Sequence, residues 1–333
     1  MTNQATNTES TPSVLRRLRR ESGRRLENTL LGAMIRVLRP DVALALTLPA
    51  VIGTAVGAWT LGAVNWITLA FALLAIFVSA LGFQSLTAYQ DYEQSRRPDA
   101  KPSTDLPGSP FALQQQGELQ PSLLLNVGAL LFAAATLCAF WLALLTGWPV
   151  LFFGAVSFLI MVGAVLPPVH FAYRGYGLGE AGIFVAFGPL ALLTGYYAQT
   201  SQVSWLPVMA GMPIALLATL VVMSQNLATA RRDWLIGKRT LPVMLGTARA
   251  LDLNAALTFT AYAGILAVTI LTRMPLWYLA GLATLPLAMG TYADIPRAEV
   301  TPERGYALRT AMVKAAFWTT VLCVAALFIS RPG

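Results

Sequence analysis

The sequence predicts an all-α integral membrane protein with about nine transmembrane helices and with its polar residues gathered on the cytoplasmic side. The prediction rests on composition, on long apolar stretches and on the uneven placement of charge. The 333 residues are 56% hydrophobic and only 11% charged, and the mean hydropathy is +0.62. Since a soluble domain typically has about 25% charged residues, this composition excludes an ordinary water-soluble fold.

Long apolar stretches recur along most of the chain. A helix that crosses about 30 Å of hydrocarbon needs roughly 20 mostly apolar residues. On that criterion the predicted spans are 42–62, 66–90, 122–145, 148–168, 181–199, 206–229, 250–272, 275–293 and 310–330. Proline lies inside several of them, for example at Pro49, Pro189 and Pro213. A packed bundle of membrane helices tolerates such prolines, because neighbouring groups satisfy the freed backbone carbonyls.

Basic residues are concentrated before the first span. The net charge is +8, and eight of the 23 Lys and Arg residues are Arg16, Arg17, Arg19, Arg20, Arg24, Arg25, Arg36 and Arg39. A basic segment next to a transmembrane helix is typical of a cytoplasmic anchor that faces anionic lipids. We therefore expect membrane lipids, and no nucleic acid, as the partner of this arm.

The loops on the two sides of the membrane differ in charge. With the basic arm in the cytoplasm, the outer loops fall near 63–65, 146–147, 200–205 and 273–274, followed by the C-terminal tail. These outer segments contain only two basic residues, Arg273 and Arg331, and no acidic residue. The positive-inside rule predicts a multi-pass protein of the cell membrane with a cytoplasmic N-terminus and an outer C-terminus. The long polar inner loops predict a working face on the cytoplasmic side.

Three segments make up the predicted domain organisation. Residues 1–13 are rich in Thr, Ser and Asn and are expected to be a disordered tail. Residues 14–38 are expected to form a basic amphipathic helix in the membrane interface, with a solvated basic tail as the alternative. The apolar positions of that helix are Leu15, Leu18, Leu26, Leu30, Met34 and Leu38. Residues 39–333 form the transmembrane domain. The sequence makes no prediction of oligomeric state.

Polar residues that could bind a ligand or take part in catalysis gather in three inner loops, 84–101, 167–180 and 225–242. The ends of the second and sixth spans resemble each other, because Gln-Ser-Leu-Thr-Ala at 84–88 is matched by Gln-Asn-Leu-Ala-Thr at 225–229. Each run leads into a carboxylate and then a basic cluster. Carboxylates at helix ends can hold magnesium, and Lys and Arg beside them supply phosphate contacts. Such a site at a membrane surface suits a diphosphate with a lipid tail.

On these residues the sequence resembles the UbiA superfamily of membrane prenyltransferases, and within it the 1,4-dihydroxy-2-naphthoate prenyltransferase branch of menaquinone biosynthesis. The matching motifs are Arg39-Pro40 with Pro49 and Gly53, the run from Tyr173 to Glu180, Phe187-Gly188-Pro189 with Tyr196, Tyr197 and Gln199, and Gly237 to Leu241 with Leu245-Gly246. The last of these is the most specific. The resemblance extends from about Arg39 to the last span.

The resemblance implies nine helices around a central cavity open to the cytoplasmic side, with a side opening for an isoprenoid tail. It implies a Mg²⁺-dependent reaction in which a prenyl diphosphate ionises and the prenyl carbon attacks a small aromatic acceptor, with loss of carboxylate in the naphthoate branch. By the same resemblance, Asp91 and Asp233 would be catalytic, and the metal ligands would be Asp91, Asp99, Asp233, Asn226 and Glu93. The diphosphate would contact Lys238, Arg239, Arg232, Arg174, Arg97 and Lys101. The substrate pocket would include Gln84, Tyr92, Tyr173 and Gln225.

The chain departs from the family pattern in both aspartate motifs. Thr87 and Ala88 occupy the Asn-Asp positions of the first motif, and Thr229 replaces the first aspartate of the second. Roughly half of the expected carboxylates are therefore missing. Two alternatives follow: a terpene cyclase or a transferase with a nonstandard acceptor, and a non-catalytic protein that binds an isoprenoid or quinone lipid. Asp91 and Asp233 could also be solvated charges, and the basic residues near them could serve only to set topology.

Overall fold

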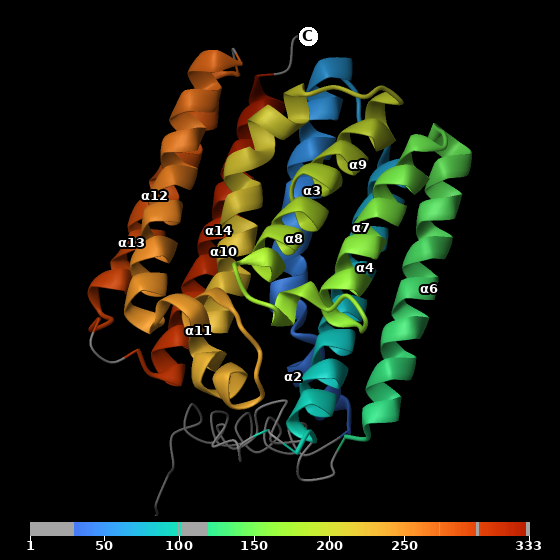
Figure 1. Ribbon diagram of the computed structural model, residues 1–333. Helices are drawn as coiled ribbons and strands as arrows, with labels where there is room; N and C mark the ends of the chain where they lie inside the picture. Colours follow the sequence, from blue (N-terminus) through green and yellow to red (C-terminus); the bar gives the residue numbers. More distant parts are fainter. Residues whose placement is uncertain (1–29, 99, 101–118, 273, 298–299, 331–333) are drawn as a thin grey trace, which may run out of the picture.

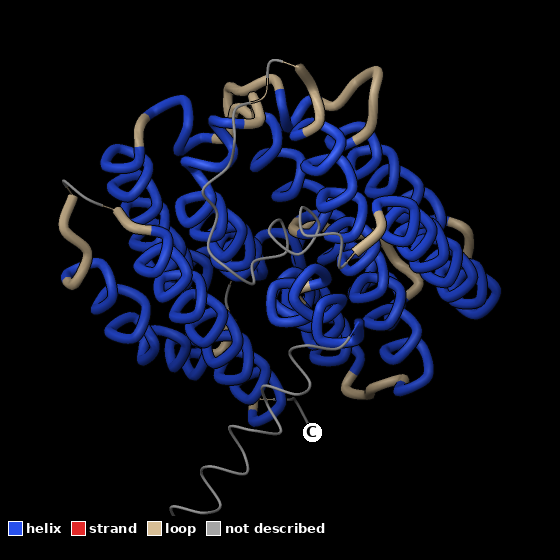
Figure 2. Tube along the Cα trace, turned by 90° about the horizontal axis from the view of Figure 1, so that it is seen from below, coloured by secondary structure: helices blue, strands red, loops and turns tan. Residues whose placement is uncertain are grey.

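The computed structural model describes residues 30–98, 100, 119–272, 274–297 and 300–330, and within these ranges the only regular secondary structure is helical (Figure 2). The elements are α2 (Leu30–Leu38), α3 (Pro40–Leu61), α4 (Trp66–Ser95), α6 (Pro121–Thr146), α7 (Pro149–Val165), η1 (Phe171–Tyr173), α8 (Leu178–Phe187), α9 (Pro189–Thr200), α10 (Leu206–Leu235), α11 (Leu241–Leu245), α12 (Thr247–Leu271), η2 (Leu276–Thr284), α13 (Leu285–Ala293) and α14 (Pro302–Ile329). The prediction of an all-α fold is confirmed.

Seven helical segments of the described residues are long and apolar enough to cross a membrane. They are Leu30–Leu61, Trp66–Ser95, Pro121–Thr146, Leu178–Thr200, Leu206–Leu235, Thr247–Leu271 and Pro302–Ile329. The other two predicted spans are helical but shorter. The predicted span 148–168 contains the 17-residue α7, and the predicted span 275–293 is divided between the 3-10 helix η2 and the nine-residue α13. The membrane architecture is therefore confirmed, while the number nine is not.

The N-terminal predictions lie mostly outside the described residues, which begin at Leu30. Residues 30–38 of the predicted amphipathic segment form α2. This helix has two faces, because Ala33 and Val37 are buried whereas Leu31 and Ile35 are exposed. The predicted disordered tail and the helix before residue 30 remain predictions.

Helix α3 lies in the interior of the bundle (Figure 1). Its residues are buried around nearly its whole circumference from Val42 to Ala58, as expected for a helix that is apolar on every side. It packs closely against α9 because Gly53 and Gly195 face each other's helix. An added Cβ at Gly53 would clash with the carbonyl oxygen of Leu192, and one at Gly195 with that of Ala50. Small residues of this kind let membrane helices approach closely.

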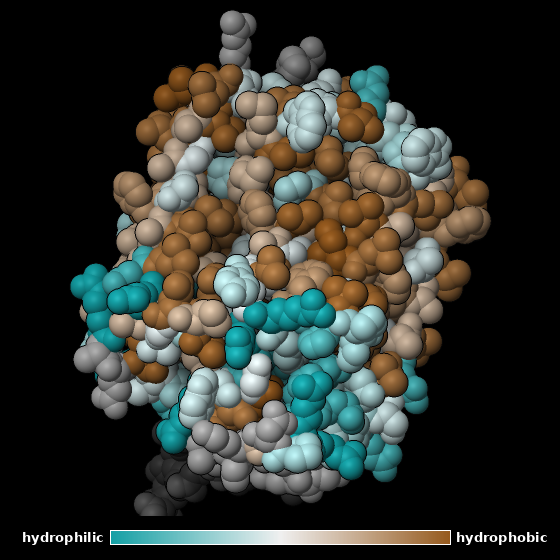
Figure 3. All heavy atoms as spheres, in the orientation of Figure 1, coloured by the Kyte–Doolittle hydropathy of each residue, from teal (hydrophilic) through white to brown (hydrophobic). Residues whose placement is uncertain are grey.

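One end of the bundle is polar. The C-terminal ends of α4 and α10 lie there with the beginnings of α3 and α14, with η1 and with α11 (Figure 1). Hydrophilic residues gather at this end, whereas hydrophobic residues cover most of the visible side of the bundle (Figure 3). The segregation of charge predicted from the sequence is thus reproduced in space, and it brings three separate loops to one place.

Candidate active site

The Asp91 side chain is the centre of a buried polar network. Asp91 is on the last two turns of α4 and is only 4% exposed. Its Oδ1 accepts hydrogen bonds from the Tyr173 hydroxyl at 2.6 Å and from Lys238 Nζ at 3.0 Å. Its Oδ2 accepts one from Arg232 Nη2 at 2.9 Å. A carboxylate removed from water needs such paired partners, because an isolated buried charge is very costly.

Asp233 on α10 is linked to Asp91 through the neighbouring arginine. The Asp233 carboxylate is fully buried, and its Oδ1 accepts a hydrogen bond from Arg232 Nη2 at 2.8 Å. Thr229, one turn earlier on the helix, donates its hydroxyl to Asp233 Oδ2 at 3.1 Å. Thr229, which stands where the family has an aspartate, therefore helps to hold the side chain of the remaining aspartate, Asp233, in place. Asp91 and Asp233, from different helices, converge on one guanidinium.

Lys238 reaches Asp91 from the loop that follows α10. The turn at this helix end passes through Gly237, whose φ of 75° is readily adopted by glycine, and the Lys238 backbone N–H then donates to the Asp233 carbonyl at 2.8 Å. This geometry directs Lys238 inward, so that it is 7% exposed. Its Nζ also lies 5.0 Å from the centre of the Tyr173 ring, within the range of a cation–π interaction.

Tyr173 provides a neutral donor to the site. It lies in η1, between α7 and α8, and is buried. Burial raises the pKa of the Tyr173 hydroxyl well above its ordinary value of 10.0, and the adjacent Asp91 charge raises it further. The hydroxyl therefore stays protonated and donates a hydrogen bond to Asp91.

Glu180 is a site residue that the sequence analysis did not single out. It is buried at the start of α8, and its Oε1 accepts hydrogen bonds from Asn226 Nδ2 at 2.8 Å and from the Leu241 backbone N–H at 3.1 Å. These bonds tie α8 to α10 and to the loop that carries Lys238. The available signal was its position at the end of the matched run, directly before an apolar span.

The network borders a cavity of about 60 Å³. Its polar lining residues are Arg39, Gln84, Thr87, Asp91, Tyr173, Glu180, Gln225, Asn226, Thr229, Arg232, Lys238 and Thr240. Lys238 and Arg232 have flexible stems and can exchange a carboxylate for a phosphate partner.

The other predicted site residues do not line this cavity. Arg174 is exposed and donates to the Pro168 carbonyl at 2.9 Å, and Arg239 is also exposed. Tyr92, Glu93 and Arg97 are near the end of α4, where Arg97 is exposed. Asp99 and Lys101 lie outside the described residues. Neighbouring residues after a helix end can therefore point in different directions: Lys238 is buried at the cavity, whereas Arg239 is exposed.

The described residues contain no group of three His, Cys, Asp or Glu side chains that could hold a metal ion. Two carboxylates nevertheless meet at one cationic atom, because Arg232 Nη2 bonds both Asp91 Oδ2 and Asp233 Oδ1. A magnesium ion in proteins is often held by one or two carboxylates together with substrate phosphates. Asp91 and Asp233 therefore fit a magnesium site that is completed by a phosphorylated ligand.

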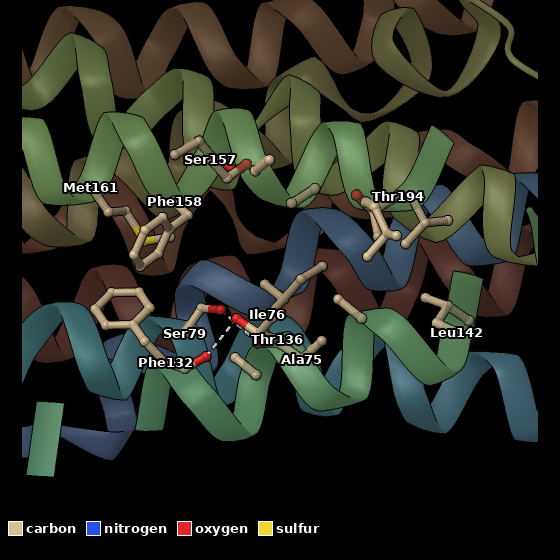
Figure 4. A pocket seen from close by; sticks show the side chains of 18 of the residues that line it. Ala75, Ile76, Ser79, Phe132, Thr136, Leu142, Ser157, Phe158, Met161 and Thr194 are labelled. Carbon is tan, nitrogen blue, oxygen red and sulfur yellow. Dashed lines mark hydrogen bonds between the residues drawn. The ribbon is translucent and has the colours of Figure 1, made fainter. Parts of the chain in front are cut away.

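A second, apolar cavity of about 380 Å³ lies deeper in the bundle, between α4, α6, α7, α8 and α9 (Figure 4). It begins about one helical turn beyond the polar cavity, since Ser79 and Met161 line the apolar cavity where Phe83 and Val165 line the polar one. The Phe83 and Phe187 rings, 6.3 Å apart, lie near this junction. Its hydroxyl groups already donate to backbone carbonyls, such as Ser79 to Ala75 and Thr136 to Phe132. Such a lining suits a hydrocarbon chain.

The fold agrees with solved membrane prenyltransferases. A UbiA homolog from Archaeoglobus fulgidus, bound to GPP and Mg²⁺, superposes with a TM-score of 0.58 at 14% identity, over 87% of this chain and 99% of that one. A structure of digeranylgeranylglyceryl phosphate synthase gives 0.54 at 16% identity, over 91% and 98% of the two chains. At these identities the likeness concerns the fold.

Sequence comparison is more specific. The chain is 31% identical over 260 residues to a 1,4-dihydroxy-2-naphthoate octaprenyltransferase of Mycobacterium tuberculosis, covering 78% of this chain and 82% of the relative. It is 28% identical over 274 residues to UbiA prenyltransferase domain-containing protein 1 of Danio rerio, covering 80% and 79%. The UbiA prenyltransferase family model matches residues 46–321. The chain is thus an integral membrane enzyme that belongs to the UbiA prenyltransferase family.

Proposed function

We propose that this prenyltransferase transfers a polyprenyl chain from an allylic diphosphate to a small aromatic acceptor, with 1,4-dihydroxy-2-naphthoate as the acceptor. The observation that carries the proposal is the convergence of Asp91, Asp233, Arg232 and Lys238 beside a deeper apolar cavity. Two mycobacterial relatives carry the name of a naphthoate octaprenyltransferase, which supports the acceptor.

The charged residues are suited to hold the diphosphate. Lys238 and Arg232 would release Asp91 and donate to the phosphate oxygens, as charge-assisted bonds to phosphate are strong. A magnesium ion held by Asp91 and Asp233 would supply further stabilisation of the charge that develops on the diphosphate. The allylic C–O bond then breaks, and its electron pair leaves with the diphosphate.

Apolar side chains that line the Asp91 cavity are suited to the second half of the reaction, in which the acceptor ring attacks the allylic carbon. A π electron pair of the acceptor ring forms the new C–C bond with the allylic carbon. When that ring carbon bears a carboxylate, CO₂ departs and the electron pair of the C–C bond returns to the ring. Phe83, Val165 and Ile183 line the same cavity as Asp91. These side chains would keep water away from the allylic cation, which water would otherwise capture.

The polar end of the bundle is proposed to face the cytoplasm, in the cell membrane. The N-terminal arm carries most of its charge as arginine, and such arms remain on the cytoplasmic side and bind anionic lipids. Helix α14 ends at Ile329, at the opposite end of the bundle from the site (Figure 1), so the C-terminus would then be on the outer side.

The proposal is tested with purified protein in lipid nanodiscs. The protein is incubated with octaprenyl diphosphate, Mg²⁺ and either 1,4-dihydroxy-2-naphthoate or 4-hydroxybenzoate, and products are identified by mass spectrometry. We expect a prenylated, decarboxylated naphthalene product, its loss with excess EDTA, and its recovery when Mg²⁺ is restored.

Other outcomes would contradict the proposal in distinct ways. A cyclised hydrocarbon formed without any acceptor would identify a terpene cyclase, and prenylation of 4-hydroxybenzoate alone would identify a different acceptor. Tight binding of prenyl diphosphate without turnover under any condition would identify a non-catalytic lipid-binding protein.

A further inference from the structure

The Arg232 guanidinium lies between the two buried carboxylates of the site. Its Nη2 donates to Asp91 Oδ2 at 2.9 Å and to Asp233 Oδ1 at 2.8 Å. Its Nε donates to the same Asp233 oxygen at 3.2 Å. Arg232 is therefore a cation that joins a carboxylate of α4 to a carboxylate of α10. A divalent cation shared by Asp91 and Asp233 would compete with it for the same oxygen atoms.

The other oxygen of each carboxylate is also occupied by protein donors. Asp91 Oδ1 accepts hydrogen bonds from the Tyr173 hydroxyl at 2.6 Å and from Lys238 Nζ at 3.0 Å. Asp233 Oδ2 accepts one from the Thr229 hydroxyl at 3.1 Å. All four carboxylate oxygens thus have a donor. A metal ion that entered the site alone would have to replace a protein hydrogen bond at every oxygen that it took.

The charges of this ion-pair network balance one another. Asp91 and Asp233 carry two negative charges, and Arg232 and Lys238 carry two positive ones. Each of these side chains is less than a tenth exposed, so water and salt screen their attraction only weakly. Breaking a buried pair is costly, because it leaves an uncompensated charge. A divalent cation added alone would place its charge beside two cations and would take from Arg232 its carboxylate partners.

A diphosphate would change this balance, because it offers the two cations other partners. Phosphate oxygens accept strong charge-assisted hydrogen bonds from Lys and Arg, and a guanidinium matches them with two parallel donors. Arg232 and Lys238 line the same cavity as Asp91, so a diphosphate in that cavity lies within their reach. Their move to the phosphate oxygens would leave Asp91 and Asp233 open to a divalent cation, which carboxylates commonly share with substrate phosphates.

We propose that Arg232 is a resident cation that keeps Asp91 and Asp233 closed to a divalent metal until a diphosphate draws it away. The inference rests on the proposed function, which supplies the diphosphate donor. Metal and diphosphate then bind with positive coupling, and by linkage each raises the affinity of the other by the same factor. The enzyme takes up the metal together with the prenyl donor rather than before it.

The first test measures Mn²⁺ binding by equilibrium dialysis, with the protein in nanodiscs of zwitterionic lipid and empty nanodiscs as the blank. We expect Arg232→Gln to bind Mn²⁺ alone about tenfold or more tightly than wild type does, because the carboxylates lose the competing cation. Arg231→Gln is the matched control: it removes the same charge one position earlier, but Arg231 is exposed and borders neither cavity. Equal affinity in Arg232→Gln and wild type, or an equal gain in Arg231→Gln, would overturn the proposal.

The second test adds geranyl thiolodiphosphate, a donor analogue whose bridging sulfur resists ionisation. Dialysis equalises the free analogue and its Mn²⁺ complex on both sides, so the excess Mn²⁺ on the protein side is bound to protein. The analogue should tighten Mn²⁺ binding to wild type about tenfold more than it tightens binding to Arg232→Gln, since only wild type has Arg232 to displace. Equally weak Mn²⁺ binding to wild type with and without the analogue would contradict the displacement of Arg232.

Thermal unfolding shows whether the variant folds and gives an independent readout. Mn²⁺ alone should raise the unfolding midpoint of Arg232→Gln but not that of wild type, because a ligand stabilises the state that binds it. If Arg232→Gln does not fold, Arg232→Lys takes its place. It keeps the charge but lacks the guanidinium that bonds both carboxylates, so Mn²⁺ binding should again tighten, and unchanged binding would refute the proposal. Because binding of Mn²⁺ alone needs neither acceptor nor turnover, its outcome is independent of whether a prenylated product forms.

Discussion

Asp91 of α4 and Asp233 of α10 accept hydrogen bonds from the same atom, Nη2 of Arg232, at 2.9 and 2.8 Å. The two carboxylates are therefore close enough to share one cation. Under the proposed function, this arrangement would compensate in part for the missing family aspartates, since the remaining two are brought to a single point rather than spread over the cavity. Their side chains are also almost fully buried, so each carboxylate depends strongly on its cationic partners.

The first prediction concerns Asp91. Asp91→Asn should lower turnover on the order of 100-fold, as for the loss of a key electrostatic group, because the change removes a proposed metal ligand and leaves Lys238 and Arg232 without their shared counter-charge. Turnover is measured by mass spectrometry of the prenylated product. Asp252→Asn is the control: Asp252 pairs with Arg297 at the surface, where both side chains are more than half exposed. Wild-type turnover in Asp91→Asn would contradict a role for this carboxylate.

The second prediction compares the neighbours Lys238 and Arg239. Lys238→Met should raise the KM for prenyl diphosphate about tenfold or more, because it removes a buried charge-assisted contact. Arg239→Met should change that KM less than twofold, since Arg239 is exposed and does not border the cavity. Steady-state kinetics at saturating acceptor provide the measurement. The reverse order of effects would show that the exposed arginine, and not the buried lysine, contacts the diphosphate.

The third prediction concerns the apolar cavity. Gly154 lines this cavity, and an added Cβ there would meet no atom within 4 Å. Gly154→Leu should therefore fill part of the cavity without disturbing the backbone, and should lower kcat/KM for octaprenyl diphosphate about tenfold relative to geranyl diphosphate.

Gly290→Leu is the matched control for this change. Gly290 is an exposed helical glycine of α13 that also has open space around it but lies away from the apolar cavity. An unchanged preference between long and short donors in Gly154→Leu would show that the isoprenoid chain takes another route.

The fourth prediction follows from the raised pKa of Tyr173. Because burial and Asp91 raise this pKa above its ordinary value of 10.0, the unfolded chain loses the hydroxyl proton at lower pH than the folded chain does. The stabilisation is fully present below about pH 10 and is lost as pH rises toward the raised value. Wild-type stability should therefore fall more steeply than that of Tyr173→Phe between pH 9.5 and pH 11 (roughly the titration range). Thermal unfolding in detergent across this range measures the difference, and parallel curves would contradict it.

Much of the fold was predictable because the bilayer acts on each span separately. Every span must hold enough apolar residues to cross the hydrocarbon and must satisfy its own backbone hydrogen bonds, so composition and length reveal it locally. The less certain elements are those in which this requirement is relaxed. The η2 segment and the short α13 after it are apolar, so the sequence predicted one transmembrane helix there. The structure has a 3-10 helix followed by a short α-helix instead.

The candidate site was predictable only in part. The sequence alone identified the membrane architecture, the polar face, the family, and the motifs that contain Asp91, Asp233 and Lys238. Only the tertiary structure decided which polar residues meet: Tyr173 but not Arg174, Lys238 but not Arg239. It also added Glu180, from a helix distant in sequence. The physical reason is that hydrophobicity is read along one helix, whereas the direction of a side chain at a helix end depends on the rotation of that helix and on how its neighbours pack around it.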